Sequence, residues 1–258
     1  MNVVRCPDGL SNSPAHFLNL VDSRCVPYSW FQLFLFAGGC VLWVVAYGII
    51  VKNAFRLRFV DMAALAGFSN FAWEFVWSWP FRTDMGWFLV YTYRAWWLLD
   101  ILIIWKTLEF GAEQFLQDWI RRHFRALGAC CIAGFGLLYY FFVRQGLDEP
   151  IGATSAYICQ LILSWACLWS LVSLPSERRF SLWVAVLKGY GTAMNTWFIY
   201  LHYPQNHLVQ ALGTIAFGID NLYIVILHRR LRSPANTIRT ENQGIQLTAN
   251  SSRCLGAE

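Results

Sequence analysis

The sequence predicts an all-α, polytopic membrane protein built from seven transmembrane helices, with the N-terminus outside or lumenal and the C-terminus in the cytosol. Hydrophobic residues make up 57% of the 258 residues and charged residues only 14%, a balance that is rare in a soluble domain of this size. Seven separate apolar stretches are each long enough to form a membrane span. Lysine and arginine gather in alternate connections between these stretches, which gives the orientation.

The seven stretches follow one another closely along the chain. A bilayer core needs roughly 20 apolar residues per helix. The first stretch begins at Trp30, after a polar segment that is too long for an ordinary cleaved signal peptide, so it is expected to remain as a membrane helix. The predicted spans are residues 30–51, 59–80, 87–105, 126–143, 152–174, 180–201 and 207–227.

The segments outside the helical domain, residues 30–230, are polar. Residues 1–29 form an N-terminal segment in which Cys6 and Cys25 are bridged if it faces an oxidising compartment, and otherwise free. Residues 231–258 lack hydrophobic periodicity and are predicted to be a disordered cytosolic tail. The connection 106–125 mixes aromatic and charged residues, so it is either a helix lying on the membrane surface or a solvated linker.

The basic residues outside the spans are distributed unequally between the two sides. One side of the predicted bundle holds only four basic residues, Arg5, Arg24, Arg82 and Arg144, and the opposite side holds fourteen. The positive-inside rule therefore places the more basic side in the cytosol. The residues on that side are Lys52, Arg56, Arg58, Lys106, Arg121, Arg122, Arg125, Arg178, Arg179, Arg229, Arg230, Arg232, Arg239 and Arg253.

Composition also bears on ligands and partners. The basic residues lie in short runs beside apolar segments and form no broad basic patch, so nucleic acid is not an expected partner. No cysteine and histidine set has the spacing of a metal site. We therefore expect neither a metal nor a cofactor, and the lipid bilayer is the expected surrounding.

Several ionisable side chains fall inside the predicted helices. Each costs on the order of 2.5–3.5 kcal/mol at a helix centre, so each needs a partner or a task. Asp61 and Asp100 lie near the predicted cytosolic helix ends, where local ion pairs with Lys106 or nearby arginines are favoured. Glu74 and Asp220 lie deeper in their helices. These two acids are the candidate catalytic residues.

Glu74 shares one helix face with polar and aromatic residues. Helical spacing aligns it with Gly67, Asn70, Trp77 and Phe81, and such a face is expected to line the bundle interior. A salt bridge to Arg94 that only fixes helix packing is the alternative interpretation. A buried carboxyl without a cation stays neutral and can donate a proton, whereas one paired with Arg94 or Lys188 stays charged.

Asp220 lies on a comparable face of the last helix. The residues that share this face are Gly213, Ala216, Phe217 and Tyr223. A third polar face, on the sixth predicted span, carries Lys188, Gly191, Asn195 and His202. If the three faces converge, they outline a cavity for a long apolar substrate.

The stretch Asn70-Phe71-Ala72-Trp73-Glu74-Phe75, together with Asp220 in the seventh span, resembles a known family. It is similar to the membrane-integral terpene cyclases of fungal meroterpenoid and indole-diterpene pathways, the paxilline type, which have bacterial relatives. The resemblance implies a multi-pass enzyme of the endoplasmic reticulum if the chain is fungal, or of the cytoplasmic membrane if it is bacterial. In that family the acid that follows a tryptophan in the second helix and an aspartate of the last helix are regarded as essential, and they match Glu74 and Asp220.

The implied reaction is protonation of a prenyl chain at an epoxide or alkene, a carbocation cascade, and final loss of a proton. Glu74 is expected to be the initiating acid or its partner, and Asp220 to act with it or as the terminal base, with the roles exchangeable. No DDxxD or DxDD pattern of the soluble terpene cyclases is present. The expected substrate pocket comprises Asn70, Trp73, Trp77, Arg94, Asn195, Phe217 and Tyr223.

A seven-helix transporter is the alternative function. The dipeptide Pro204-Gln205 is similar to the motif of PQ-loop carriers. Those carriers have two such motifs in repeated halves, whereas this sequence has one and no internal repeat.

Overall fold

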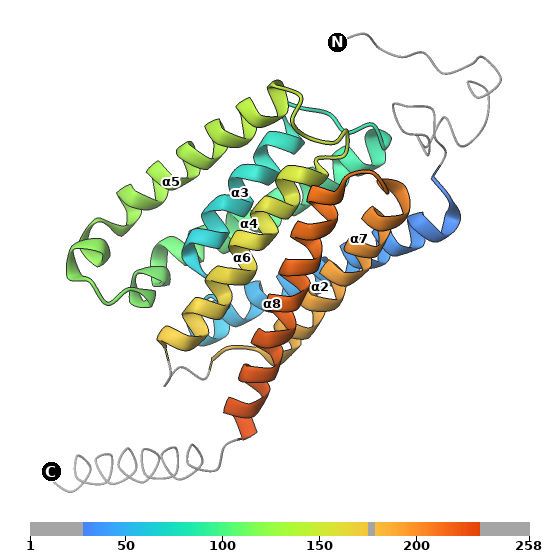
Figure 1. The fold of residues 1–258 in the computed structure, drawn as a ribbon. Helices are drawn as coiled ribbons and strands as arrows, with labels where there is room; N and C mark the ends of the chain where they lie inside the picture. The colour runs from blue at the N-terminus through green and yellow to red at the C-terminus, as the bar shows by residue number, and fades with distance from the viewer. Residues whose placement is uncertain (1–27, 175–178, 233–258) are drawn as a thin grey trace, which may run out of the picture.

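The computed structural model describes residues 28–174 and 179–232. Within these ranges the chain forms seven α-helices and one short 3-10 helix and contains no strand, so the all-α prediction is confirmed for this part (Figure 1). Cys6, Cys25 and the tail after Arg232 lie outside the described residues. The elements in order are α2 (Trp30–Leu57), α3 (Ala64–Ser78), α4 (Gly86–Phe110), η1 (Gly111–Gln114), α5 (Asp118–Arg144), α6 (Ala153–Ser173), α7 (Leu182–His202) and α8 (His207–Arg232).

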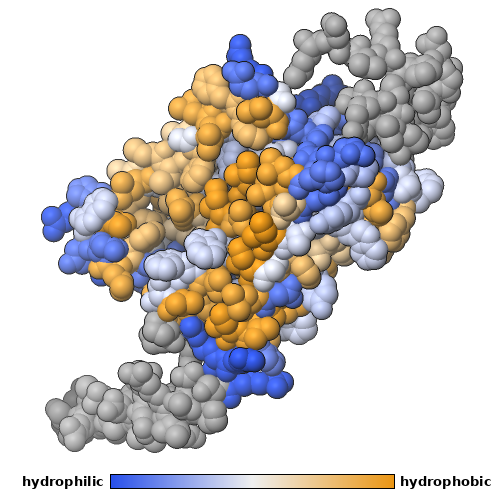
Figure 2. Space-filling view, viewed as in Figure 1, coloured by the Kyte–Doolittle hydropathy of each residue, from blue (hydrophilic) through white to orange (hydrophobic). Residues whose placement is uncertain are grey.

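The surface of the bundle is apolar over much of its middle. Figure 2 shows hydrophobic residues across the central part of one face and hydrophilic residues gathered at the ends of the bundle. By length and composition, α2, α5, α6 and α8 are apolar enough to cross a membrane. In α4 and α7 several Trp and Tyr residues lower the hydropathy, because their rings carry polar groups.

Helix α3 is shorter than the stretch predicted at 59–80. It has 15 residues, which corresponds to ~22 Å at 1.5 Å per residue. Its C-terminus lies just before Pro80, which disfavours helical geometry at Trp79. At the other side, Arg58 adopts a left-handed conformation with φ of 50° and ends α2. The chain then needs residues 59–63 to turn into α3.

The predicted surface helix at 106–125 is wrong, and so is the alternative of a long solvated linker. Helix α4 continues to Phe110, and Lys106 pairs with Glu109 one turn later at 2.7 Å. Helix α5 already begins at Asp118, which is favourable in a first helical turn. Between them, the Gln114 side chain accepts from Ala64 N at 2.8 Å and donates to Met62 O at 3.1 Å. The short connection is thereby tied to the start of α3.

Helix α3 occupies a central position in the bundle. It packs against α4, α5 and α6, while α2 packs against α7 and α4, and α8 packs against α6 and α7 (Figure 1). Ala66, Gly67 and Ala72 on α3 are buried small residues that allow this close packing. The face that carries Gly67, Glu74 and Trp77 is buried, as its spacing predicts.

The basic connections meet at one end of the bundle. Arg230 near the end of α8 donates to Leu171 O and Leu174 O at the end of α6. Arg179 donates to Leu57 O at the end of α2. The alternate connections that hold most lysines and arginines are therefore joined in space.

Gly152 has a conformation and a contact that only glycine permits. It is the N-cap of α6 with φ of 78°, and an added Cβ would lie 2.5 Å from Trp77 Cε2. We expect Gly152→Ala to destabilise the protein by about 1–3 kcal/mol through overpacking and backbone strain. Thermal unfolding of the purified protein in detergent, followed by tryptophan fluorescence, measures the effect.

Gly218→Ala is the matched control, because an added Cβ there meets no atom within 4 Å. It is expected to leave the unfolding temperature unchanged or to raise it, since alanine favours a helix interior. Equal unfolding temperatures for the two variants would contradict the packing argument.

Candidate active site

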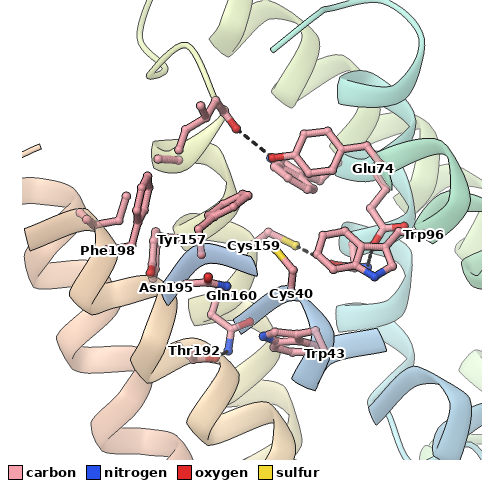
Figure 3. A pocket seen from close by; sticks show the side chains of 18 of the residues that line it. Cys40, Trp43, Glu74, Trp96, Tyr157, Cys159, Gln160, Thr192, Asn195 and Phe198 are labelled. Carbon is pink, nitrogen blue, oxygen red and sulfur yellow. Dashed lines mark hydrogen bonds between the residues drawn. The ribbon is translucent and has the colours of Figure 1, made fainter. Parts of the chain in front are cut away.

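A cavity lies inside the bundle between α2, α3, α4, α6 and α7. It encloses about 850 Å³ of empty space, its open mouth included. Its wall is largely aromatic, with a few polar groups (Figure 3). The lining residues include Phe36, Cys40, Trp43 and Tyr47 of α2, Asn70, Trp73 and Glu74 of α3, Tyr93 and Trp96 of α4, Tyr157, Cys159 and Gln160 of α6, and Thr192, Asn195 and Phe198 of α7.

Glu74 is the acid of this cavity wall. Its side chain is buried, and Oε1 accepts hydrogen bonds from Asn70 Nδ2 at 3.0 Å and from the Tyr47 hydroxyl at 3.2 Å. Asn70 Nδ2 also donates to Tyr47 at 2.6 Å and to Asp100 Oδ2 at 2.8 Å. Helices α2, α3 and α4 thus contribute one polar residue each to a cluster around Asn70.

Three buried polar atoms in the lining residues make no hydrogen bond among the described residues. They are Glu74 Oε2, Asn195 Oδ1 and Trp96 Nε1. A buried polar atom without a partner costs free energy, roughly 1–3 kcal/mol. Each of these atoms is enclosed within the wall of the cavity.

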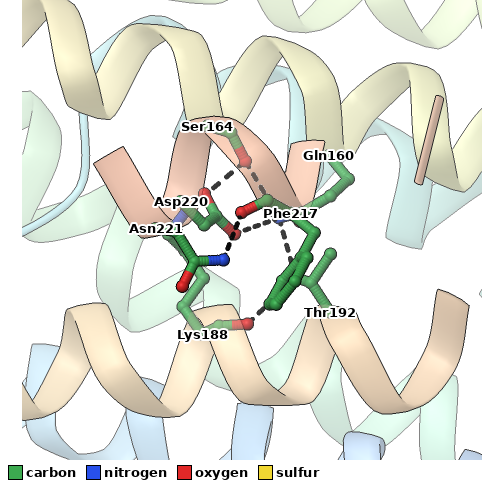
Figure 4. Close-up of polar contacts among 7 residues, drawn as sticks. All are labelled: Gln160, Ser164, Lys188, Thr192, Phe217, Asp220 and Asn221. Carbon is green, nitrogen blue, oxygen red and sulfur yellow. Dashed lines mark hydrogen bonds and ion pairs between the residues drawn. The ribbon is translucent and has the colours of Figure 1, made fainter. Parts of the chain in front are cut away.

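Asp220 does not line the cavity but is connected to its wall (Figure 4). It is fully buried and forms an ion pair with Lys188. Gln160 Nε2 donates to Asp220 Oδ2 at 3.3 Å, to Thr192 Oγ1 at 3.0 Å and to Ser164 Oγ at 3.1 Å. Because Gln160 and Thr192 face the cavity, Asp220 holds part of the wall in place from behind.

Trp73 is held by a polar group of α6. Its Nε1 donates to Ser155 Oγ at 2.7 Å, and Trp77 Nε1 donates to the same oxygen at 3.4 Å. Ser155 Oγ in turn donates to Asp148 Oδ2. Asp148 Oδ1 also accepts from the backbone N–H groups of Glu149, Thr154 and Ser155, so it caps the start of α6.

Asp148 lies in the connection before α6, and the pKa of its carboxyl determines its charge at neutral pH. Burial raises the pKa of its carboxyl to about 6, and the hydrogen bonds from Ser155 and the backbone act in the opposite direction. At neutral pH the carboxyl is therefore ionised and accepts all four hydrogen bonds. This keeps the Trp73 indole in a defined orientation at the cavity.

The structure brings together four of the predicted site residues on α3 and α7. Asn70, Trp73, Glu74 and Asn195 all line the cavity. Trp77 is buried one turn further along α3, where it contacts Gly152 and Ser155 outside the cavity wall.

Arg94 lies outside the cavity, and the alternative of an Arg94–Glu74 salt bridge is wrong. Arg94 Nε donates to Ser78 O at 3.1 Å, and its guanidinium lies 4.7 Å from the Trp79 ring. The arginine thus caps the C-terminal end of α3 and stacks on exposed aromatic rings. Lys188, the other candidate cation, does neutralise a buried acid, namely Asp220.

The predicted face of α8 is separated from the cavity. Phe217 is 37% exposed and Tyr223 lines a separate small hollow beside Lys188. Helix α8 packs on α6 and α7, and these two helices supply the cavity wall instead. The polar faces of α7 and α8, the sixth and seventh predicted spans, therefore meet each other. Of these two helices, only α7 contributes residues to the cavity wall.

Asp100 was expected in an ion pair at a helix end, and this prediction is wrong. Helix α4 continues to Phe110, so Asp100 lies ~15 Å from the helix end and contacts Asn70. Tyr93, Trp96 and Asp100 are spaced by three and four residues, a pattern that places them on one face. That spacing is the signal in the sequence that relates Asp100 to the cavity, whereas no local pattern indicates Tyr47 or Gln160.

Comparison with known proteins assigns this arrangement to a family. Residues 22–228 match the family model described as Pyr4-like transmembrane terpene cyclases. The chain belongs to this family. The resemblance drawn from the Glu74 region and Asp220 is thus confirmed at the level of the family, and the Pyr4-like chain is a membrane protein of a terpene cyclase family.

Curated relatives of this Pyr4-like chain come from fungi. It is 24% identical to a Pyr4-family terpene cyclase of Annulohypoxylon moriforme, over 81% of this chain and 84% of the relative. It is 24% identical to a terpene cyclase of Colletotrichum higginsianum, over 70% and 87%, and 22% identical to the terpene cyclase pyr4 of Aspergillus fumigatus, over 72% and 81%. No solved structure matches the chain significantly.

Family membership favours the cyclase over the carrier. Pro204 and Gln205, the dipeptide that suggested a PQ-loop carrier, form the tight turn between α7 and α8. Asn206 N donates to Tyr203 O at 3.0 Å across that turn.

The ion pair between Lys188 and Asp220 can be tested by removing its charges one at a time and together. Removing one member leaves the other charge buried and unpaired, so Lys188→Met is expected to destabilise the protein by about 3–5 kcal/mol. The double variant Lys188→Met, Asp220→Asn removes both charges and is expected to recover part of that loss. Thermal unfolding in detergent measures both variants, and a double variant no more stable than Lys188→Met alone would contradict the pairing.

Proposed function

We propose that this Pyr4-like chain cyclises the prenyl chain of a meroterpenoid-type substrate and that Glu74 donates the initiating proton. The observation that carries this proposal is the position of Glu74: a buried carboxyl on the wall of an aromatic cavity, whose Oε2 makes no hydrogen bond to any residue that the structure describes. No described lysine, arginine or histidine pairs with Glu74. In apolar surroundings without a cation, a carboxyl group keeps its proton and can act as an acid.

The reaction begins when the Glu74 O–H bond breaks and its proton passes to an epoxide oxygen or terminal alkene carbon of the prenyl chain. Opening of the epoxide C–O bond, or protonation of the alkene, leaves a carbocation that the chain's double bonds attack in turn. Loss of one proton at the end forms an alkene. The proton given up equals the proton gained, so substrate and product are isomers.

The aromatic wall suits the cationic steps. Trp43, Trp73, Tyr93 and Trp96 line the cavity, and a ring face stabilises a nearby cation by about 0.5–2 kcal/mol. An apolar enclosure also keeps water from the cation before the rings have closed. The Asn195 amide and the Trp96 indole, which also line the cavity, are the polar groups suited to orient the substrate scaffold.

For Asp220 we propose an indirect role in place of direct proton transfer. Its carboxylate is paired with Lys188 and reaches the cavity wall only through Gln160. Asp220 then fixes the Gln160 amide, and with it one boundary of the substrate space. Among the residues that line the cavity, Glu74 alone has a carboxyl group, so its carboxylate, formed in the first step, is the candidate for the terminal base.

We also propose the membrane arrangement. All seven helices span the bilayer, with the basic end in the cytosol and the N-terminus in the lumen. The joined basic connections at one end of the bundle support this orientation. The fungal source of the curated relatives supports the endoplasmic reticulum as the compartment, with an apolar, prenylated substrate drawn from the lipid phase.

Glu74→Gln tests the proposed acid, because it keeps the shape of the side chain and removes the transferable proton. Membranes that contain the variant should convert a prenylated substrate with a terminal epoxide at least ~10²-fold more slowly than wild type. Product formation is measured by mass spectrometry and chromatography at equal expression.

Glu109→Gln serves as the control, because Glu109 pairs with Lys106 near the cytosolic end of α4, away from the cavity. Its activity should equal that of wild type. Undiminished cyclisation by Glu74→Gln would rule out the catalytic assignment.

A further inference from the structure

A second carboxyl group lies directly behind Glu74. Asp100 of α4 is 1% exposed and does not line the cavity. Its Oδ2 accepts from Asn70 Nδ2 at 2.8 Å, and the same nitrogen donates to Glu74 Oε1 at 3.0 Å. One amide nitrogen therefore bridges two buried carboxyl groups from neighbouring helices.

The hydrogen atoms available to this cluster are too few for two carboxylates. Asn70 Nδ2 carries two hydrogens and faces three acceptors, since the Tyr47 oxygen lies 2.6 Å away. The second oxygens, Glu74 Oε2 and Asp100 Oδ1, are buried without a partner. Two ionised carboxylates here would leave several lone pairs unsatisfied as well as repel each other.

The surroundings supply no compensating positive charge. The titratable groups hydrogen-bonded to this cluster are Tyr47 of α2 and Cys159 of α6, and Tyr139 of α5 is linked to Cys159 through Ser69. None of these groups is positively charged in any protonation state. Within residues 28–174 and 179–232, no lysine, arginine or histidine pairs with Glu74 or Asp100.

We propose that Glu74 and Asp100 form a carboxyl pair that holds one proton between them at neutral pH, with Asp100 acting as a positioning residue for the acid. Two carboxyl groups this close in an apolar site do not both ionise, and the pair titrates as a unit. The negative charge on Asp100 keeps the proton on Glu74, which faces the cavity. The inference deepens the proposed function and rests on it for its catalytic meaning.

During turnover the net charge of the Glu74–Asp100 pair changes. The Glu74 O–H bond breaks as the substrate takes the proton, so the charge of the pair changes from −1 to −2. The positive charge that the proton transfer leaves on the substrate balances this transient charge, and Asn70 and Tyr47 donate to Glu74 Oε1 until the cation at the end of the cascade returns a proton to Glu74. No other reactant is needed.

The protonation of the pair can be measured without any substrate. Infrared spectra of the protein in lipid nanodiscs, recorded across a pH series, report the C=O stretch of protonated carboxylic acids. Wild type should keep such a band above neutral pH. In Asp100→Asn the midpoint of its titration should fall by about 1 pH unit or more, because the like charge is gone.

Two further variants make this result specific. Glu74→Gln should also lower the midpoint of the band that remains, which then belongs to Asp100, because Asp100 has lost its like-charged neighbour. Asp61→Asn is the matched control, since Asp61 is a buried carboxyl that accepts from Ser181 N at 2.6 Å on a different part of the bundle. It should leave the midpoint unchanged. Equal midpoints in wild type and Asp100→Asn would overturn the proposal.

Activity gives the second measurement. Asp100→Asn should move the alkaline limb of the pH–rate profile to lower pH by the same amount as the infrared midpoint, whereas a structural role would lower the rate equally at every pH. Absence of cyclisation in wild type would contradict the proposed function and leave the infrared result valid. A shifted band with an unshifted pH–rate profile would refute the role of Asp100 in the reaction.

Discussion

The cost of burying charge in an apolar helix bundle determines how this protein arranges its polar residues. Every ionisable group in the bundle must find an opposite charge, a set of hydrogen bonds or a proton. Asp220 finds the first in Lys188. Among the described residues no cation pairs with Glu74 or Asp100, and the two share the amide of Asn70. Around the cavity, the cluster at Asp220 is therefore charge-compensated and the cluster at Glu74 is not.

These two clusters have different relations to the cavity. The uncompensated cluster contributes Glu74 to the wall, and the proposed reaction takes its proton from this carboxyl. The compensated cluster lies behind the wall and contacts the cavity through Gln160. A carboxylate paired with Lys188 is a poor proton donor but a rigid anchor, and for this reason we propose the chemistry for α3 and α4 and the support for α6, α7 and α8.

The aromatic wall depends on polar anchors in the same way. Trp73 keeps its orientation because Ser155 accepts from the indole and Asp148 holds Ser155 at the start of α6. A cation that migrates through several positions needs ring faces at defined places, and a freely rotating indole would not provide them. The Gly152 backbone, which lies against Trp77, adds a steric constraint to the same corner.

The sequence by itself determined the apolar helices and the candidate acid Glu74, since apolar runs of membrane length and the spacing of Asn70, Glu74 and Trp77 are local properties. It also indicated that Lys188 or Arg94 would neutralise a buried carboxyl. Only the tertiary structure decided which one does so, because the choice depends on helix neighbours far apart in the chain: Lys188 meets Asp220, while Arg94 caps α3. The same reason explains Asp100, which was expected at a helix end. Because α4 extends further and packs against α3, Asp100 and Glu74 accept from the same Asn70 amide. Helix periodicity orders residues along one face, but the packing of the bundle selects which faces meet.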